Sequence, residues 1–178
     1  MVEYYFDTET TGINPLSDKI ITIQWQQLDR FTGKPVSDLQ ILKEWESSEK
    51  EILEKFFLIF KCEYPFDFIP IGKNLGFDFK FLSYRAKKYG LKGLDIEYFY
   101  GRPHLDLKHV LVIINQGQFR GYDRVIDKEG SLIEVDVPKL YKEHKYSEII
   151  KYIEKEAKMF NEAYQVLKKQ MPSLNKLL

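Results

Sequence analysis

The sequence has 178 residues, 44% of them hydrophobic, which is enough for one compact domain with a single core. Lysine plus arginine and aspartate plus glutamate each number 27, so a net charge of zero excludes a global field that attracts nucleic acid or an anionic membrane. The single cysteine, Cys62, excludes an intramolecular disulfide, and no apolar run is long enough to span a membrane, so we expect a cytoplasmic protein.

Three strands are predicted in the first part of the chain. Residues 2–6 are β-branched and aromatic, residues 20–28 alternate with a period of two, and residues 38–45 follow a turn-rich segment. We expect these strands to form an antiparallel meander. Asp7 and Glu9 come directly after the first strand, in the stretch YYFDTETTG.

Helices and a further strand are predicted next. Ser48 and Glu51 have the spacing of a capping box, so a helix begins there and ends before Pro65. Residues 66–71 then resemble a short buried strand, and residues 77–89 a helix that Gly90 closes. Asp106 is predicted to cap a helix over residues 107–114, whereas residues 116–145 show no clear periodicity.

The last predicted helix, from residue 147 to about residue 170, has the clearest pattern. Apolar residues fall on one face of it, and Glu156 lies within that stripe, with Tyr152 one turn before. The alternation of strands and helices predicts an α/β domain with a mixed sheet flanked by helices.

A carboxylate that faces a core needs a partner. Glu156 is therefore expected either to pair with a buried lysine or arginine, or to share a cation with other acids. Asp7 and Glu9 lie on the same face of a strand and would supply two more carboxylates. A divalent cation would remove the repulsion between them.

The segment FDTETTG resembles the first motif of the DEDD, or DnaQ-like, 3′-to-5′ exonucleases. The segment GKNLGFDF is similar to the second motif, with Asn74, Phe77 and Asp78 in the matching positions. In YIEKE, Tyr152 stands four residues before Glu156, as in the tyrosine form of the third motif. The chain departs from the family in having Glu156 where an aspartate is usual, and the extra methylene shifts the carboxylate by about 1 Å.

The resemblance implies an RNase H-like fold, one exonuclease domain over residues 1–178, and two Mg²⁺ or Mn²⁺ ions held by four acids. These ligands would be Asp7, Glu9, Asp78 and Glu156, with Tyr152 orienting the attacking water. Asn74 and Phe77, and the Thr10, Thr11 and Gly12 segment, would contact substrate. On the residues alone, Asp78 is equally an acid at a helix start, Tyr152 a tyrosine at the edge of the core, and the Thr-Thr-Gly segment an ordinary turn.

The implied function is a stand-alone exonuclease that releases nucleoside monophosphates from single-stranded DNA ends, as in DNA repair or proofreading. Three alternatives stay open at this point: an RNA-trimming exoribonuclease or oligoribonuclease with the same site, a catalytically weak nucleic-acid-binding module, and a structural or interaction protein in which Glu156 pairs with a buried base. A homo-oligomer could join local basic patches, such as Arg85, Lys87 and Lys88, although such runs are usually solvated faces.

Overall fold

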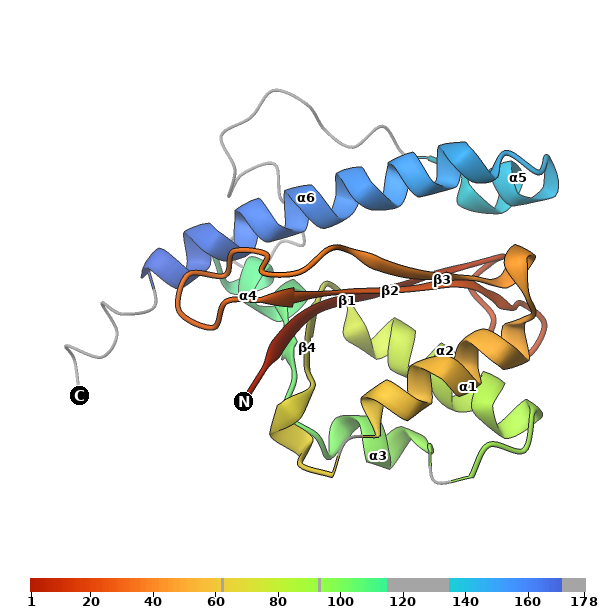
Figure 1. Ribbon diagram of the computed structural model, residues 1–178, viewed down its shortest axis with the longest axis horizontal. Helices are drawn as coiled ribbons and strands as arrows, with labels where there is room; N and C mark the ends of the chain where they lie inside the picture. Colours follow the sequence, from red (N-terminus) through yellow and green to blue (C-terminus); the bar gives the residue numbers. More distant parts are fainter. Residues whose placement is uncertain (62, 93, 115–134, 171–178) are drawn as a thin grey trace.

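A five-stranded mixed sheet forms the centre of the structure, a computed structural model that describes residues 1–61, 63–92, 94–114 and 135–170 (Figure 1). The strands lie in the order β3-β2-β1-β4-β5. Their bounds are β1 Glu3–Thr10, β2 Ile20–Leu28, β3 Gln40–Lys43, β4 Ile69–Gly72 and β5 Leu105–Asp106. The mixed sheet flanked by helices confirms the predicted fold class.

The sheet combines an antiparallel and a parallel half, which meet at β1. β1 pairs with β2 and β2 with β3 in antiparallel register, which confirms the predicted meander. β4 pairs in parallel with β1, and β5 in parallel with β4. The carboxyl ends of β1, β4 and β5 therefore lie at the same edge of the sheet.

Helices cover both faces of the sheet (Figure 1). The helices are α1 Glu49–Phe60, α2 Leu75–Lys88, α3 Ile96–Tyr100, α4 Leu107–Ile114, α5 Val137–Lys142 and α6 Tyr146–Gln170. Phe6 and Trp25 pack on α1, α2 and α3 on one face, whereas Tyr5 and Ile71 pack on α4 and α6 on the other. The period of two along β1 thus divides the core into two layers.

Two helices match their sequence patterns, one in its capped start and the other in its buried face. The Ser48 hydroxyl accepts a hydrogen bond from the Glu51 N–H, at 3.2 Å, and so caps α1. Along α6 the apolar stripe faces the protein interior, where its members are buried: Ile149, Ile153, Phe160, Ala163 and Leu167.

Other boundaries differ from the predictions. β1 continues to Thr10, so Asp7 and Glu9 lie within the strand instead of beyond its end, because their backbones pair with Gln24 and Thr22 of β2. β3 is only four residues long. A 3₁₀ turn occupies Pro65–Asp67, so β4 begins at Ile69 and not at residue 66. The short elements α3, β5 and α5 were not predicted.

Some predictions fall outside the described residues. Cys62 is one of them, as is most of the segment over residues 116–145, of which the structure describes the part from residue 135 that contains α5. No helix in the described part of the chain is long and apolar enough to cross a membrane.

Candidate active site

Three carboxylates from the two ends of the described chain converge at the carboxyl end of β1. Asp7 and Glu9 come from β1 and Glu156 from the middle of α6, and one oxygen of each lies within 4.8 Å of the others. β1 directs Tyr5, Asp7 and Glu9 to the same face. The Phe160 ring of α6 packs on Tyr5, with 4.8 Å between the ring centroids, and Glu156 lies one helical turn before Phe160. This packing brings Glu156 to the two acids of β1.

A fourth carboxylate approaches from the other layer of the protein. Asp78 lies in the first turn of α2 and is only 2% exposed. The Thr8 hydroxyl donates a hydrogen bond to Asp78, at 2.6 Å. Because Thr8 stands between Asp7 and Glu9 and points to the opposite face, this bond connects the start of α2 to the strand that carries the other acids.

All four acids line one cavity of about 280 Å³. Asn74, Phe77 and Tyr152, which the motifs single out, line it as well. The remaining lining residues, which the sequence analysis did not select, are Thr8, Lys73 and Lys108. Aspartates, glutamates and lysines therefore meet in a single concave site.

The acids of this cavity are held in an environment that opposes their ionisation. Burial, followed by the negative charges of Glu156 and Asp78, raises the pKa values of Asp7 and Glu9 well above their usual range. Burial also raises the pKa of Asp78 to about 7, although the hydrogen bond from Thr8 opposes this shift. Such raised values in a cleft are typical of functional sites.

Tyr152 contributes a phenol that stays protonated. Its burial, followed by the nearby charges of Glu156 and Glu9, raises its pKa. Tyr152 and Glu156 are four residues apart on α6, a spacing that brings side chains together on one helix face. The hydroxyl is therefore a hydrogen-bond donor at the edge of the acid cluster.

Comparison with known proteins identifies the family. The model of the RNase H superfamily matches residues 4–174. The chain belongs to the RNase H superfamily. An uncharacterized protein of Methanocaldococcus jannaschii, MJ0365, is 30% identical over 140 residues, which cover 78% of this chain and 69% of that protein.

Solved structures of exonuclease I share the RNase H-like fold. An exonuclease I complex, ExoI/SSB-Ct, aligns with a TM-score of 0.61 and 13% identity over 97% of this chain and 42% of that protein. Exonuclease I of E. coli in complex with a dA16 oligonucleotide aligns with a TM-score of 0.50 and 14% identity, over 64% of this chain and 30% of that protein. The chain thus spans less than half the length of these exonucleases.

The donor set of this RNase H-like site fits a hard divalent cation. Carboxylate oxygens are the ligands that Mg²⁺ and Mn²⁺ prefer. Within the described residues, no ion pair joins Glu156 to a lysine or arginine, so the alternative of a buried Glu156 ion pair finds no support. The Asp7 carboxylate accepts hydrogen bonds from neutral donors, the Gln24 amide at 3.1 Å and the Tyr5 hydroxyl at 3.4 Å.

The Thr10, Thr11 and Gly12 segment lies beside the cavity and does not line it. Thr10 donates a hydrogen bond to the Gly12 carbonyl at 2.6 Å, and the Thr11 hydroxyl accepts one from the Lys19 N–H at 3.0 Å. A Cβ atom on Gly12 would lie 2.4 Å from a carboxylate oxygen of Asp18. These contacts describe a tight turn after β1, and a role in substrate binding stays a prediction.

One member of the predicted basic clusters is not available to a ligand. Arg85 is 2% exposed and forms an ion pair with Glu49, at 2.6 Å, so the expectation that it follows a nucleic-acid backbone is wrong. The guanidinium of Arg85 instead pairs with the buried Glu49 carboxylate of α1. Lys87 and Lys88 are exposed.

Asp106 caps a helix, as its position before α4 predicts. Its carboxylate accepts a hydrogen bond from the Lys108 N–H at 2.9 Å. His104, two residues earlier, contacts the Arg102 carbonyl through Nδ1 at 2.8 Å.

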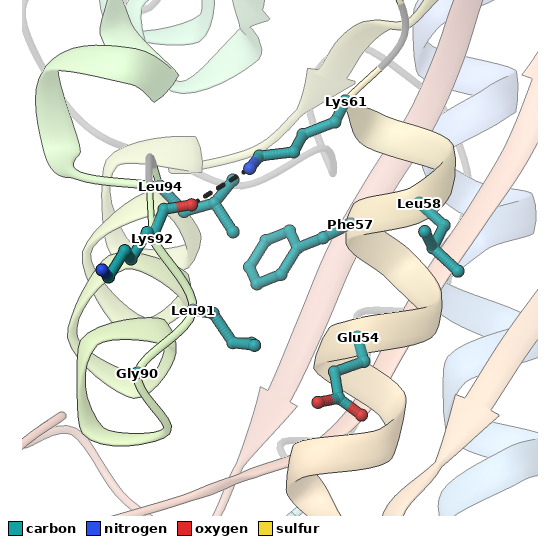
Figure 2. Close-up of a pocket in the computed structure, with 8 residues that line it drawn as sticks. All are labelled: Glu54, Phe57, Leu58, Lys61, Gly90, Leu91, Lys92 and Leu94. Atoms are coloured by element: carbon teal, nitrogen blue, oxygen red, sulfur yellow. Dashed lines mark hydrogen bonds between the residues drawn. The ribbon is translucent and has the colours of Figure 1, made fainter.

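A larger cavity, of about 660 Å³, lies between α1 and the segment that follows α2 (Figure 2). Phe57 and Leu91 point into this space, and the Lys61 ammonium donates to the Lys92 carbonyl at 3.0 Å (Figure 2). Glu54 is the one acid among the described residues that line it. Size alone therefore does not locate the chemistry, since the clustered carboxylates line the smaller cavity.

Proposed function

We propose that this chain is a metal-dependent 3′-to-5′ exonuclease that hydrolyses single-stranded DNA ends to nucleoside monophosphates. The observation that carries the proposal is the convergence of Asp7, Glu9 and Glu156 within 4.8 Å in an RNase H-like fold. The buried position of Asp78 in the same cavity supports it.

The four acids are the groups that would hold the ions. A pair of Mg²⁺ or Mn²⁺ ions would supply Lewis acidity toward the scissile phosphate and make the attacking water more acidic. The raised pKa values of Asp7 and Glu9 favour this use, because a cation relieves the repulsion that opposes their ionisation.

The other residues of the cavity position the reactants. The Tyr152 phenol, which stays protonated at neutral pH, would donate a hydrogen bond to the attacking water and so fix its direction. Thr8 holds the Asp78 carboxylate through a 2.6 Å hydrogen bond. Phe77 offers an aromatic ring on which a terminal base can stack.

Single-stranded DNA is the proposed substrate because a terminal phosphodiester must enter a cavity of only about 280 Å³. Exonuclease I of E. coli, which shares this fold, forms a complex with a dA16 oligonucleotide. DNA is preferred over RNA here from the likeness to free-standing proofreading-type nucleases. An RNA substrate for the same site is the second outcome that the test must distinguish.

The test is a gel time course with 5′-labelled single-stranded DNA and RNA of the same sequence, with Mg²⁺ or Mn²⁺ and with a chelator. We expect a ladder that shortens from the 3′ end only when metal is present. Chromatography of the products should give nucleoside 5′-monophosphates, and the polymer that is cut faster names the substrate.

Two variants control the test. Asp7→Asn keeps the shape of the side chain and should abolish cleavage, whereas Asp38→Asn, at an exposed position, should leave it unchanged. Immediate release of the labelled end, internal cuts, or cleavage by Asp7→Asn equal to that of the wild type would contradict the proposal. Metal-independent binding without any product would favour the binding module.

A further inference from the structure

The acid cavity has a second wall that is cationic. Lys73, Asn74 and Lys108 line it together with the four carboxylates. Lys73 and Asn74 follow the carboxyl end of β4, and Lys108 follows that of β5. The parallel pairing of Gly72 with Asp106 brings these two segments side by side. The cavity therefore combines a wall that suits cations with a wall that suits an anion.

Asp106 organises the cationic wall through both segments. Its Oδ1 atom accepts hydrogen bonds from the Asn74 N–H at 2.7 Å and the Lys108 N–H at 2.9 Å. The Lys108 ammonium in turn donates to the Asn74 side chain at 2.8 Å. Asn74 has a left-handed backbone with φ of 66°, which asparagine tolerates better than most residues. The wall is thus fixed before any ligand binds.

Lys108 occupies a position that is unfavourable for a cation. It lies in the first turn of α4, where the helix dipole disfavours a cation. Its side chain is half-buried and reaches across to Asn74 instead of extending into solvent.

Gly72 brings this wall close to β1. A Cβ atom at this position would lie 2.6 Å from the Phe6 carbonyl oxygen, a contact that real side chains do not make. Only glycine therefore allows the end of β4, with Lys73 and Asn74 directly after it, to lie so near the strand that carries Asp7. The two walls stand within one substrate-sized cavity for this reason.

We propose that Lys73 and Lys108, together with the Asn74 amide, form a subsite for a backbone phosphate of the bound strand, and that Asp106 is its positioning residue. This inference rests on the proposed function and names how the same site recognises its substrate. Lysine binds phosphate as a point charge, and its protons can only be donated. The subsite also supplies the local positive charge that a chain of zero net charge needs to bind a polyanion.

The experiment measures binding apart from cleavage. Fluorescein-labelled single-stranded DNA pentamers are titrated, in Ca²⁺ and over a range of salt, into protein with the Asp7→Asn change, alone or combined with Lys108→Met. Loss of one phosphate contact should lower the slope of log affinity against log salt by about 0.7 and weaken binding by about tenfold. Lys92→Met, at an exposed lysine of the larger cavity, is the matched control and should change neither value.

Methylphosphonate substitution then locates the contact. Each phosphate of the pentamer is replaced in turn by the neutral analogue. We expect one position to weaken binding to the parent protein by about tenfold and to leave binding to Lys108→Met unchanged. Lys108→Arg should restore the sensitivity, and the melting temperature of each variant verifies that it is folded.

The role of Asp106 is tested by non-additivity. Asp106→Ala should reduce sensitivity to the same methylphosphonate, and its combination with Lys108→Met should bind no more weakly than Lys108→Met alone. Equal sensitivity of Lys108→Met and its parent at every phosphate would overturn the inference, even if the wild type is an active nuclease. A wild type that binds DNA without cutting it would refute the proposed function and leave this binding result valid.

Discussion

Buried and half-buried carboxylates occur in two regions of this molecule, and they differ in what neutralises them. Glu49 accepts hydrogen bonds from Arg85 Nε and Nη2 at 2.7 and 2.6 Å, from the Tyr89 hydroxyl at 2.8 Å and from the Ile20 N–H at 2.8 Å. The Glu49 hydrogen bonds raise the pKa of Arg85, which stays charged. This carboxylate is fully satisfied from within the chain.

The acid cavity is arranged in the opposite way. Within the described residues, its carboxylates receive neutral donors such as Thr8 and Gln24, and no ion pair includes them. The same chain therefore neutralises one buried acid with an arginine and leaves a cluster of acids without one. Because buried charges are normally paired, bound to metal or neutralised by protonation, the difference supports the proposal that the cluster holds a metal ion.

The largest effect is expected when Glu49 loses its arginine, so that it is left without a cation as the acids of the cavity are. Arg85→Met would leave Glu49 buried without its cation and lower the free energy of unfolding by about 3–5 kcal/mol, as urea denaturation at pH 7 would measure. Lys87→Met, on an exposed side of the same helix, is the control. The double variant Glu49→Gln with Arg85→Met should lose less stability than Arg85→Met, and a loss equal to the single variant would contradict this account.

The next effect tests how closely the acid cavity is shaped around Glu156. Glu156→Asp would withdraw the carboxylate by about 1 Å from Asp7 and Glu9 and lower kcat by up to about 10²-fold. Thermal unfolding without metal should be unchanged, because the residue keeps its charge and its half-buried position. A kcat equal to or above that of the wild type would show that the longer side chain of Glu156 is not required.

A comparable effect is expected when a divalent cation is added to the protein. Mg²⁺ or Mn²⁺ at about 100 times its dissociation constant should stabilise the fold by about 2.7 kcal/mol and raise Tm by about 5–10 °C. Calorimetry of the wild type, Asp7→Asn and Asp38→Asn would measure it. Only Asp7→Asn should lose the shift, and an equal shift in all three proteins would mean that the ions bind elsewhere.

The smallest effect concerns pH. The raised pKa values of the acids mean that the metal-free fold binds more protons than the unfolded chain, so its stability falls as pH rises from about 4 toward the Asp78 pKa of about 7. Urea unfolding in a chelating buffer at pH 5 and pH 8 would reveal this slope. Asp78→Asn should reduce it, whereas a slope that Asp78→Asn leaves unchanged would place the titration on other groups.

Sequence patterns predicted the elements whose stability is local. The period of two directs Asp7 and Glu9 to one face, and the helical period isolates Glu156 within an apolar stripe, so these acids could be selected from the sequence alone. Elements as short as β5 and α3 could not be, because a few residues carry no period.

Contacts between distant segments escaped prediction for a different reason. Lys108 meets Asn74, and Arg85 meets Glu49, only after the sheet brings their elements together. A lysine that lines a cavity and an arginine buried in an ion pair look like solvated charges in a sequence. The one signal available for Lys108 was its unfavourable place in the first turn of a helix.

The order of the acid-bearing elements along the chain has a consequence for synthesis. A ribosome releases β1, with Asp7 and Glu9, well before it releases α6, with Glu156. Closing so long a loop is an entropically demanding step that follows local folding. The nascent protein therefore lacks Glu156 beside Asp7 and Glu9 until α6 docks on β1, so under the proposed function it would not cleave nucleic acid while it is still being made.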